Sequence, residues 1–482
     1  MALSWSQQAL QSLVQDLRMP TNPTTAGLLS CGQKYLDGLL AAADHLLRGE
    51  QLEKSLRSTL DCFVNQSHAK MASSSGNPAI GWRRLYTDAC ILQAFADIRS
   101  FISTGDESLA ISSISSLDHA IIIAGAAGTG RLDLILDLIE KVQSECLERH
   151  EFAGTSDAFQ ISPSKNIVPP PPLHTFTKKV PCIDQSPSLA AFQSRLSKRP
   201  FVLPGYILDW PALTEHPWRD LNYLRSAAGP GRVIPVEVGG DYRSDDWTQE
   251  IMPWDTFLDV LSQPLTSGSS KSRILYLAQH DLFTQFPALR ADIILPDYVY
   301  ASMSPPENMP QYSPPTNEDQ LVLNAWLGPA GAVSPAHTDP YFNFYGDSNL
   351  HRSRRDTDLL TAQVVGRKTV WLAPPDATLS MYPYSSQSGT ATPHNPAANN
   401  TNVSMSNTSR VDVFCDSPKN GTNSRSSGKM PYRRLCVSHW NQEICYIFLR
   451  DGGMRCTARR RAFLFRCGFD FSELGGSVDA KV

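Results

Sequence analysis

The chain has 482 residues, of which 41% are hydrophobic and 19% charged, with 43 Lys and Arg against 47 Asp and Glu. This composition excludes a disordered or fibrous protein, and the length indicates two or three globular domains. The net charge of −4 argues against a general attraction to nucleic acid or to a membrane surface. No run is apolar and long enough to cross a bilayer, and the N-terminus lacks the basic-then-apolar order of a secretory signal. We therefore expect a protein of the nucleus, the cytoplasm or both.

Residues 1–160 are predicted to form a helical domain. Apolar residues recur at intervals of three and four in LEKSLRSTLDCFV, WRRLYTDACILQAFADIRSFI and RLDLILDLIEKVQSECLERH. This is the spacing of helices with one buried face. Such bundles more often pack or bind partners than catalyse reactions. The run GAAGTGR at 125–131 has the glycines of a phosphate loop, but no Lys-Ser or Lys-Thr follows, so we predict a turn.

A Pro-rich linker is predicted at 161–180, where four consecutive prolines favour an extended segment. From residue 181 onward, short apolar runs such as GRVIPVEVGG, SRILYLAQH and QLVLNAWLGP alternate with turn residues. These runs predict strands of an antiparallel sandwich or barrel, with helices such as WDTFLDVLSQ between them. The predicted fold class is α+β.

His337 and Asp339 stand two positions apart, just after the predicted strand in NAWLGP. On extended backbone both side chains point to the same face. An imidazole and a carboxylate on one face can supply two corners of a two-histidine, one-carboxylate site, which binds Fe(II) and leaves positions open for a co-substrate and O₂. The spacing alone is weak evidence, because two such residues are more often solvated in a loop.

Longer runs carry a family resemblance. SRILYLAQHDLF, NAWLGPAGAVSPAHTDPYFNF and AQVVGRKTVWLAPP resemble the JmjC-domain family of Fe(II)/2-oxoglutarate oxygenases, in particular the branch of lysine-specific demethylase 8, also described as an arginyl hydroxylase. RPFVLPGYILDWPAL and VIPVEVGGDYRSDDW are similar to the same branch, so the resemblance extends to residue 414. It implies a helical N-terminal region followed, at 181–414, by a cupin-type double-stranded β-helix. It also implies Fe(II) as cofactor, with 2-oxoglutarate and O₂ as co-substrates.

The resemblance assigns iron and substrate roles to four residues. His337 and Asp339 would bind the iron. Glu237 and Trp247 match positions that hold a basic substrate side chain between an anion and an aromatic wall. The implied substrates are arginyl side chains, which would be hydroxylated, or methyl-lysyl side chains, which would be demethylated. The implied partner is a protein, possible examples being histones and ribosomal proteins.

Five further residues match positions that surround 2-oxoglutarate. Lys368 would pair with the distal carboxylate of the co-substrate. Tyr276, Ser334 and Asn343 would donate hydrogen bonds to it, and Trp326 would pack its pocket wall. Plain core packing is the alternative for Trp326 and for Trp247.

The segment 346–361, GDSNLHRSRRDTDLLT, interrupts the resemblance. Members of this branch run directly from the strand with Asn343 into the strand with Lys368, whereas this segment is polar. Its codons permit a splice donor at Gly346 and an acceptor at 360–362. Removal of the segment joins Tyr345 to Ala362, and we therefore predict a retained short intron.

The tail at 415–482 lacks the last iron ligand that the resemblance implies. That ligand is a His on a later strand, in a context like LEPGDxLYIPPGWWHAM followed by FSVSMWF. If codons 439 to 469 are read in the frame that starts at the third base of each printed codon, the amino acids that they must or can encode follow much of this order. We predict a frame slip near Cys415, with the last strands missing or garbled.

No third iron ligand is found in frame. His394 and His439 lack the strand context of a ligand, and His351 lies inside the suspected intron. Five cysteines lie in the tail without any Cys-x-x-Cys pair, which argues against a zinc site.

Because the sequence departs from the family in these ways, an alternative function of another class stays open, namely that of a catalytically impaired, non-enzymatic binding protein. A third alternative is a sugar-binding or isomerase-type cupin, which the strand of Lys368 and the pair of Glu237 and Trp247 disfavour.

Overall fold

The structure is a computed structural model. It describes residues 4–19, 23–73, 77–147, 181–196, 201, 203, 205–239, 242–243, 246–262, 274–301, 322–329, 334–337, 343–345, 362–365, 381–382, 384, 408–410 and 464–470.

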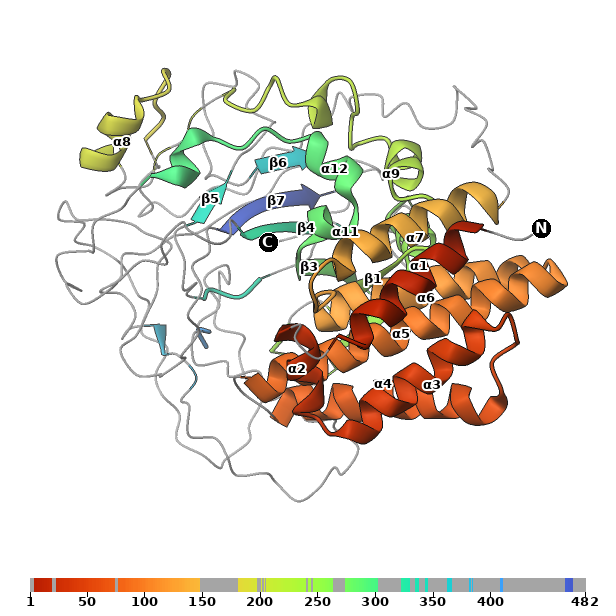
Figure 1. The fold of residues 1–482 in the computed structure, drawn as a ribbon. Coiled ribbons are helices and arrows are strands. Elements are labelled where there is room, and N and C mark those ends of the chain that lie inside the picture. The colour runs from red at the N-terminus through yellow and green to blue at the C-terminus, as the bar shows by residue number, and fades with distance from the viewer. Residues whose placement is uncertain are drawn as a thin grey trace, which may run out of the picture.

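The N-terminal part is a bundle of helices, as the three- and four-residue periodicity predicts. The helices are α1 (Ser4–Leu17), α2 (Pro23–Leu29), α3 (Gln33–Leu47), α4 (Lys54–Ser73), α5 (Asn77–Thr104), α6 (Glu107–Ala124) and α7 (Arg131–Glu145). Figure 1 shows them gathered on one side of the molecule, with α5 packed against α4 and α6. Asp106 caps the start of α6 by accepting the Ser108 N–H, and Gly125 ends it in the left-handed conformation at φ 63°. The predicted turn at 125–131 is therefore confirmed for 125–130, and α7 begins at Arg131.

Four charged side chains join α1, α5 and α7 inside the bundle. Arg84 donates from Nε to Asp88 (2.5 Å) and from Nη2 to Asp16 (2.9 Å). Arg131 donates from Nε to Asp88 (2.7 Å) and from Nη2 to Asp16. Arg84, Asp88 and Arg131 are buried. Each carboxylate thus bridges the two guanidinium groups, which offsets the cost of removing these charges from water.

Asp16 gives this cluster a sensitivity to acid. Burial alone would raise the pKa of Asp16, but hydrogen bonds and charges from Arg84 and Arg131 lower it below 3.8. A lowered folded-state pKa stabilises the fold above the unfolded pKa, and this contribution is lost as the pH falls through the folded value. We expect Asp16→Asn to lower the free energy of unfolding at pH 7 by about 1–3 kcal/mol. The difference from the unsubstituted chain should shrink below about pH 4.

Urea unfolding followed by circular dichroism at several pH values measures this effect. Asp44→Asn is the matched control, because Asp44 pairs with Arg18 at the surface and should contribute less than about 1 kcal/mol. If the free energy of unfolding of Asp16→Asn stays below that of the unsubstituted chain by the same amount down to acid pH, the prediction is contradicted.

The remainder of the described chain is built on one sheet. Its strands are β1 (Val233–Val238), β2 (Thr248–Pro253), β3 (Leu275–His280), β4 (Val322–Gly328), β5 (Asn343–Tyr345), β6 (Ala362–Val365) and β7 (Leu464–Asp470). The strand order is β2-β1-β3-β4-β7-β5, and β6 also pairs with β7. The pairs among β1 to β4 are antiparallel. The helical region followed by an antiparallel sheet confirms the predicted α+β class.

Short helices cover one face of this sheet. They are η2 (Pro211–Leu213), α9 (Leu221–Ala228), α10 (Trp254–Ser262), α11 (Leu282–Gln285) and α12 (Pro287–Ala291). The helices α8 (Leu189–Ser194) and η3 (Asp297–Tyr300) pack against each other in a separate apolar cluster. The apolar side of β1, β3 and β4 packs with residues of α9, α10 and α11, and Trp254 and Phe257 are fully buried there. The buried sheet residues of this core are Ile234, Val236, Val238, Leu275, Leu277, Leu323, Ala325, Leu327 and Val364.

Strand β7 lies in the tail that is predicted to be out of frame. It pairs with β4, β5 and β6 in parallel, whereas the pattern of short strands predicted antiparallel pairs. Parallel neighbours require a long connection, and here it runs from residue 329 to residue 463. The edge of β4 opposite β3 carries backbone groups that need partners, and the segment LFRCGFD, with two phenylalanines, supplies them.

Strands β5 and β6 lie end to end along one edge of β7. Tyr345 is the partner of Arg466, and Ala362 is the partner of the next residue, Cys467. The register therefore continues from β5 to β6 as if 346–361 were not there. The retained intron at 346–361 stays a prediction, because that segment lies outside the described residues.

Among the described residues, no helix combines the length and the apolar character that a membrane span needs.

Candidate active site

The face of the sheet opposite the apolar core carries the predicted substrate residue Glu237. Along β1, buried Val236 and Val238 alternate with half-buried Glu237, as the pleat requires. Glu237 is directly opposite Tyr276 of β3, so both side chains lie on this face. The Tyr276 ring covers Gly328 of β4, where an added Cβ would come within 2.4 Å of the Tyr276 Cδ2 atom. The sheet thus brings Glu237 and Tyr276 together, and Gly328 leaves room for the ring.

Trp247 contacts Glu237 at the start of β2. Its indole N–H donates to Glu237 Oε2 at 3.4 Å, and both side chains are half-buried. Burial raises the pKa of Glu237 above 4.5, and the hydrogen bond from Trp247 lowers it in part. Within the described part of the chain, no ion pair joins Glu237 to a basic side chain. A cation that enters this site would therefore stabilise the ionised carboxylate.

Trp326 is almost completely buried, at 2% exposure. It lies on β4 two residues before Gly328, on the face that carries Tyr276. Its position agrees with the predicted role of Trp326 in the pocket wall beside Tyr276. Its burial agrees equally with the alternative, plain core packing.

His337 lies in a short extended segment after β4. Its Nδ1 is 2.7 Å from the carbonyl oxygen of Pro335, and its backbone forms a bridge with Thr408. A bond to a carbonyl requires the proton on Nδ1, which leaves the lone pair on Nε2. Imidazoles that bind metals are commonly held in this way. The described donor therefore fits an iron ligand, although the described residues contain no group of three or more metal-binding side chains.

Several predicted site residues lie outside the described residues. Asp339, Lys368, the side chain of Asn343, and the histidines at 351, 394 and 439 belong to this set. Ser334 is described and half-buried, three residues before His337. The structure thus brings together Glu237, Trp247, Tyr276 and, on the same face, Trp326.

The segment at 408–410, which no sequence pattern predicts, pairs with the segment of His337. The Ser409 N–H donates to the Ala336 carbonyl (2.8 Å), and the Tyr384 N–H donates to the Thr408 carbonyl (3.1 Å). The Tyr242 hydroxyl, five residues after Glu237, lies 3.3 Å from Thr408 Oγ1. Thr408 therefore links the segment of His337 to the loop after β1. The contacts of Ser409 with Ala336 and of Tyr242 with Thr408 join residues more than 70 positions apart, so no local sequence signal could have identified them.

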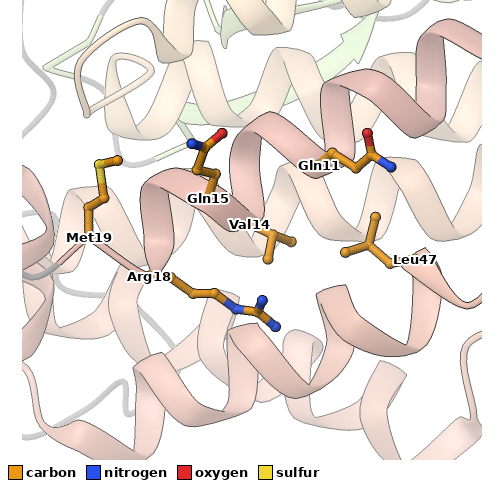
Figure 2. Close-up of a pocket in the computed structure, with 6 residues that line it drawn as sticks. All are labelled: Gln11, Val14, Gln15, Arg18, Met19 and Leu47. Carbon is orange, nitrogen blue, oxygen red and sulfur yellow. The ribbon is translucent and has the colours of Figure 1, made fainter.

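A groove of about 400 Å³ lies elsewhere, in the helical bundle. Figure 2 shows its lining, which consists of Gln11, Val14, Gln15, Arg18, Met19 and Leu47. These residues belong to α1, to the turn that follows it and to α3. None of them belongs to the sheet, so the groove is separate from the residues around Glu237.

Comparison with known proteins agrees with this architecture. Residues 190–436, more than half of the chain, match the family described as the cupin-like domain. This match includes every strand from β1 to β6 and stops before β7.

Three named relatives are similar to the chain. Lysine-specific demethylase 8 of Danio rerio is 31% identical over 309 residues, which cover 64% of this chain and 66% of that protein. Jumonji C domain-containing protein 5 of Drosophila melanogaster is 38% identical over 46% of this chain and 49% of its own length. Lysine-specific demethylase JMJ30 of Arabidopsis thaliana is 37% identical over 39% of this chain and 35% of its own length.

The chain thus spans between about a third and two thirds of the length of these relatives. The family match covers the sheet that carries Glu237, Tyr276 and Trp326, and the relatives are named for the JmjC domain or for lysine demethylation. The chain therefore belongs to the cupin-like family, in its JmjC branch and close to lysine-specific demethylase 8.

Proposed function

We propose that this chain derives from an Fe(II)- and 2-oxoglutarate-dependent protein oxygenase that acts on arginyl or methyl-lysyl side chains. The names of its relatives support an enzyme of the JmjC type that acts on proteins. Basic proteins such as histones or ribosomal proteins are the proposed partners, and the nucleus, the cytoplasm or both the proposed location.

The observation that carries this proposal is the environment of Glu237. Its carboxylate is half-buried, accepts one hydrogen bond from Trp247 and lies on the sheet face of Tyr276. A guanidinium or methylammonium group would supply the missing positive charge, and the Trp247 ring offers it an aromatic surface. Both cations satisfy this site, so the charge alone does not choose between hydroxylation and demethylation.

The proposed ligands of the iron are His337 and Asp339. Lys368 would pair with the distal carboxylate of 2-oxoglutarate, and Tyr276, Ser334 and Asn343 would form hydrogen bonds with the co-substrate. Such a centre supplies oxidation of a substrate C–H bond by O₂, with 2-oxoglutarate as the source of electrons. His337 would present Nε2, because its Nδ1–H donates a hydrogen bond to the Pro335 carbonyl. The buried ring of Trp326 would help to exclude water from this region.

We also propose that the chain as printed departs from its functional message at two places. The segment 346–361 would be a retained intron, because it is polar and interrupts the resemblance between the strand of Asn343 and the strand of Lys368. The tail 415–482 would be read out of frame, which would remove the second iron-binding His. The printed chain would then be impaired, and the rival function is a binding protein without turnover.

Release of succinate tests the proposed function. Two chains are compared, the printed one and one made from the corrected message, each with Fe(II), 2-oxoglutarate and peptides that contain arginine or methyl-lysine. We expect iron-dependent turnover from the corrected chain and little from the printed one. Sequencing of the transcript across codons 340–470 is the independent check. The absence of both iron uptake and turnover in the corrected chain would refute the proposal.

The raised pKa of Glu237 predicts a pH dependence for peptide binding. Because the carboxylate must be ionised to bind a cation, the affinity for a basic peptide should rise with pH through a range above 4.5. The stability of the fold should change in the opposite direction. A raised folded-state pKa stabilises the fold at low pH, and this contribution is lost as the pH rises through the folded-state pKa. Calorimetric titration from about pH 5 to pH 8 measures the affinity.

Glu237→Gln should weaken binding by at least about tenfold at pH 8 and remove this pH dependence. Glu215→Gln, at an exposed position, is the control and should leave the profile unchanged. The same profile in Glu237→Gln as in the unsubstituted chain would contradict the assignment.

A further inference from the structure

The helical bundle is joined to the sheet by a buried ion pair between Asp118 of α6 and Arg232. Arg232 donates from Nη2 to Oδ1 of Asp118 at 2.7 Å and from Nε to Oδ2 at 2.9 Å. The two side chains are 0% and 5% exposed. The guanidinium also donates to the Gln285 carbonyl and stacks over the Phe286 ring. Arg232 is the residue immediately before β1, so this pair lies at the start of that strand.

Asp118 also completes the hydrogen bonding of β1 itself. Val233 is opposite Pro253 of β2, and the Trp254 N–H donates to the Arg232 carbonyl. In an antiparallel ladder this arrangement turns the backbone groups of Val233 away from β2, toward the other edge of β1. On that edge the register with β3 includes only Glu237 and Val238 among the described residues.

Two side chains replace the missing strand partner at Val233. Its N–H donates to Asp118 Oδ2 at 2.9 Å, and its carbonyl accepts from Gln285 Nε2 at 2.7 Å. A buried backbone group without a partner is costly, so these bonds hold the strand in place where β3 ends. The helical bundle thus supplies a hydrogen-bond acceptor to the sheet that carries Glu237.

A second contact fixes the chain that leads into β1. Gln143 of α7 donates to the carbonyls of Ala228 and Pro230, at 3.1 and 2.8 Å. Gly229 and Gly231 have φ values of 72° and 81°. A Cβ at Gly229 would come within 2.6 Å of Gln143, so the backbone approaches the bundle as closely as glycine allows.

We infer that the helical bundle positions the substrate-binding face, and that Asp118 is the positioning residue through which it acts on Glu237. Glu237 lies four residues from Val233 on the same short strand. If the start of β1 loses its acceptor, the strand frays and the carboxylate no longer has a fixed place opposite Tyr276. The part of this inference that concerns substrate binding rests on the function proposed above.

Two double variants of the full chain separate the hydrogen bond from the charge. Asp118→Leu with Arg232→Met removes both buried charges and leaves Val233 N–H without its acceptor. Asp118→Asn with Arg232→Met is equally uncharged and nearly isosteric, but keeps an oxygen at position 118. Replacing both members of a buried pair by neutral residues is often tolerated, so both chains should fold. Asp97→Asn serves as a control, because Asp97 is a buried acceptor in the bundle, with Arg57 and Ser112 as donors.

Hydrogen exchange by mass spectrometry reports on the amides of β1. We expect exchange at least about tenfold faster in the Leu double variant, with near-normal protection in the Asn double variant and in Asp97→Asn. The dissociation constant for a basic peptide should rise about tenfold in the Leu variant alone. In the chain made from the corrected message, KM should rise while kcat at saturating peptide changes little, a split that general loss of folded protein would not produce.

Unchanged protection of β1 in the Leu double variant would overturn the inference. Faster exchange in both double variants would assign the effect to the lost charges, which also overturns the inference. Faster exchange in the Leu double variant with unchanged peptide affinity would give Asp118 a purely structural role, which overturns the inference as well. If the unsubstituted chain binds no basic peptide, the proposed function fails, whereas the exchange measurement still decides whether Asp118 holds β1.

Discussion

In the chain made from the corrected message, His337→Ala is expected to abolish metal binding by the proposed site and to reduce turnover by at least about a thousandfold. A bound metal contributes several kcal/mol to the transition state, and each 1.4 kcal/mol corresponds to about a factor of ten. Replacement by Ala removes the Nε2 donor that the bond to Pro335 orients. Titration with Mn(II) followed by electron paramagnetic resonance measures metal binding, and succinate release measures turnover.

His119→Ala is the matched control for this substitution. His119 is half-buried in α6 and, like His337, has its Nδ1 2.7 Å from a backbone carbonyl oxygen, that of Ser115. It should retain metal binding and turnover, because it shares the local geometry of His337 but lies in the bundle. Metal binding that persists in His337→Ala would remove the basis for the proposed iron site.

The parts of the fold that depend on local pattern could be predicted from the sequence. The runs GRVIPVEVGG, SRILYLAQH and QLVLNAWLGP contain β1, β3 and β4, because alternation of buried and exposed residues has a period of two. The helices of the bundle follow from the three- and four-residue spacing in the same way. Glu237 and Tyr276 were found through the family resemblance, and the register of β1 with β3 explains why both lie on one face.

The parts that depend on distant contacts could not be predicted. Asp118 lies in the run SSLDHAIIIA, where a lone carboxylate on a helix is usually solvated, and its partner Arg232 is 114 positions away. The bridge of His337 to Thr408 and the bond from Tyr242 to Thr408 are equally remote. The parallel pairing of β7 depends on an open edge of β4, which no local pattern reveals.

Asp88→Ala is expected to lower the free energy of unfolding by about 3–5 kcal/mol, the cost of removing one partner from a buried ion pair. Asp88 is 0% exposed and accepts from Nε of both Arg84 and Arg131. Without it, the two buried guanidinium groups lose one of the carboxylates that they share, and the other, Asp16, is partly exposed to solvent. The helices α1, α5 and α7 should then separate more easily. Urea unfolding followed by far-ultraviolet circular dichroism measures the loss.

Asp137→Ala tests whether this effect belongs to burial or to ion pairing in general. Asp137 also accepts from a basic side chain, Lys141, at 2.7 Å on α7, but its side chain is 48% exposed. Water already solvates both of these charges, so the substitution should cost no more than about 0.5 kcal/mol. A similar loss in both variants would mean that the cluster around Asp88 contributes no more than a surface pair. A loss confined to Asp88→Ala would identify the buried charges as the element that joins α1 and α7 to the central helix α5, against which α6 is packed.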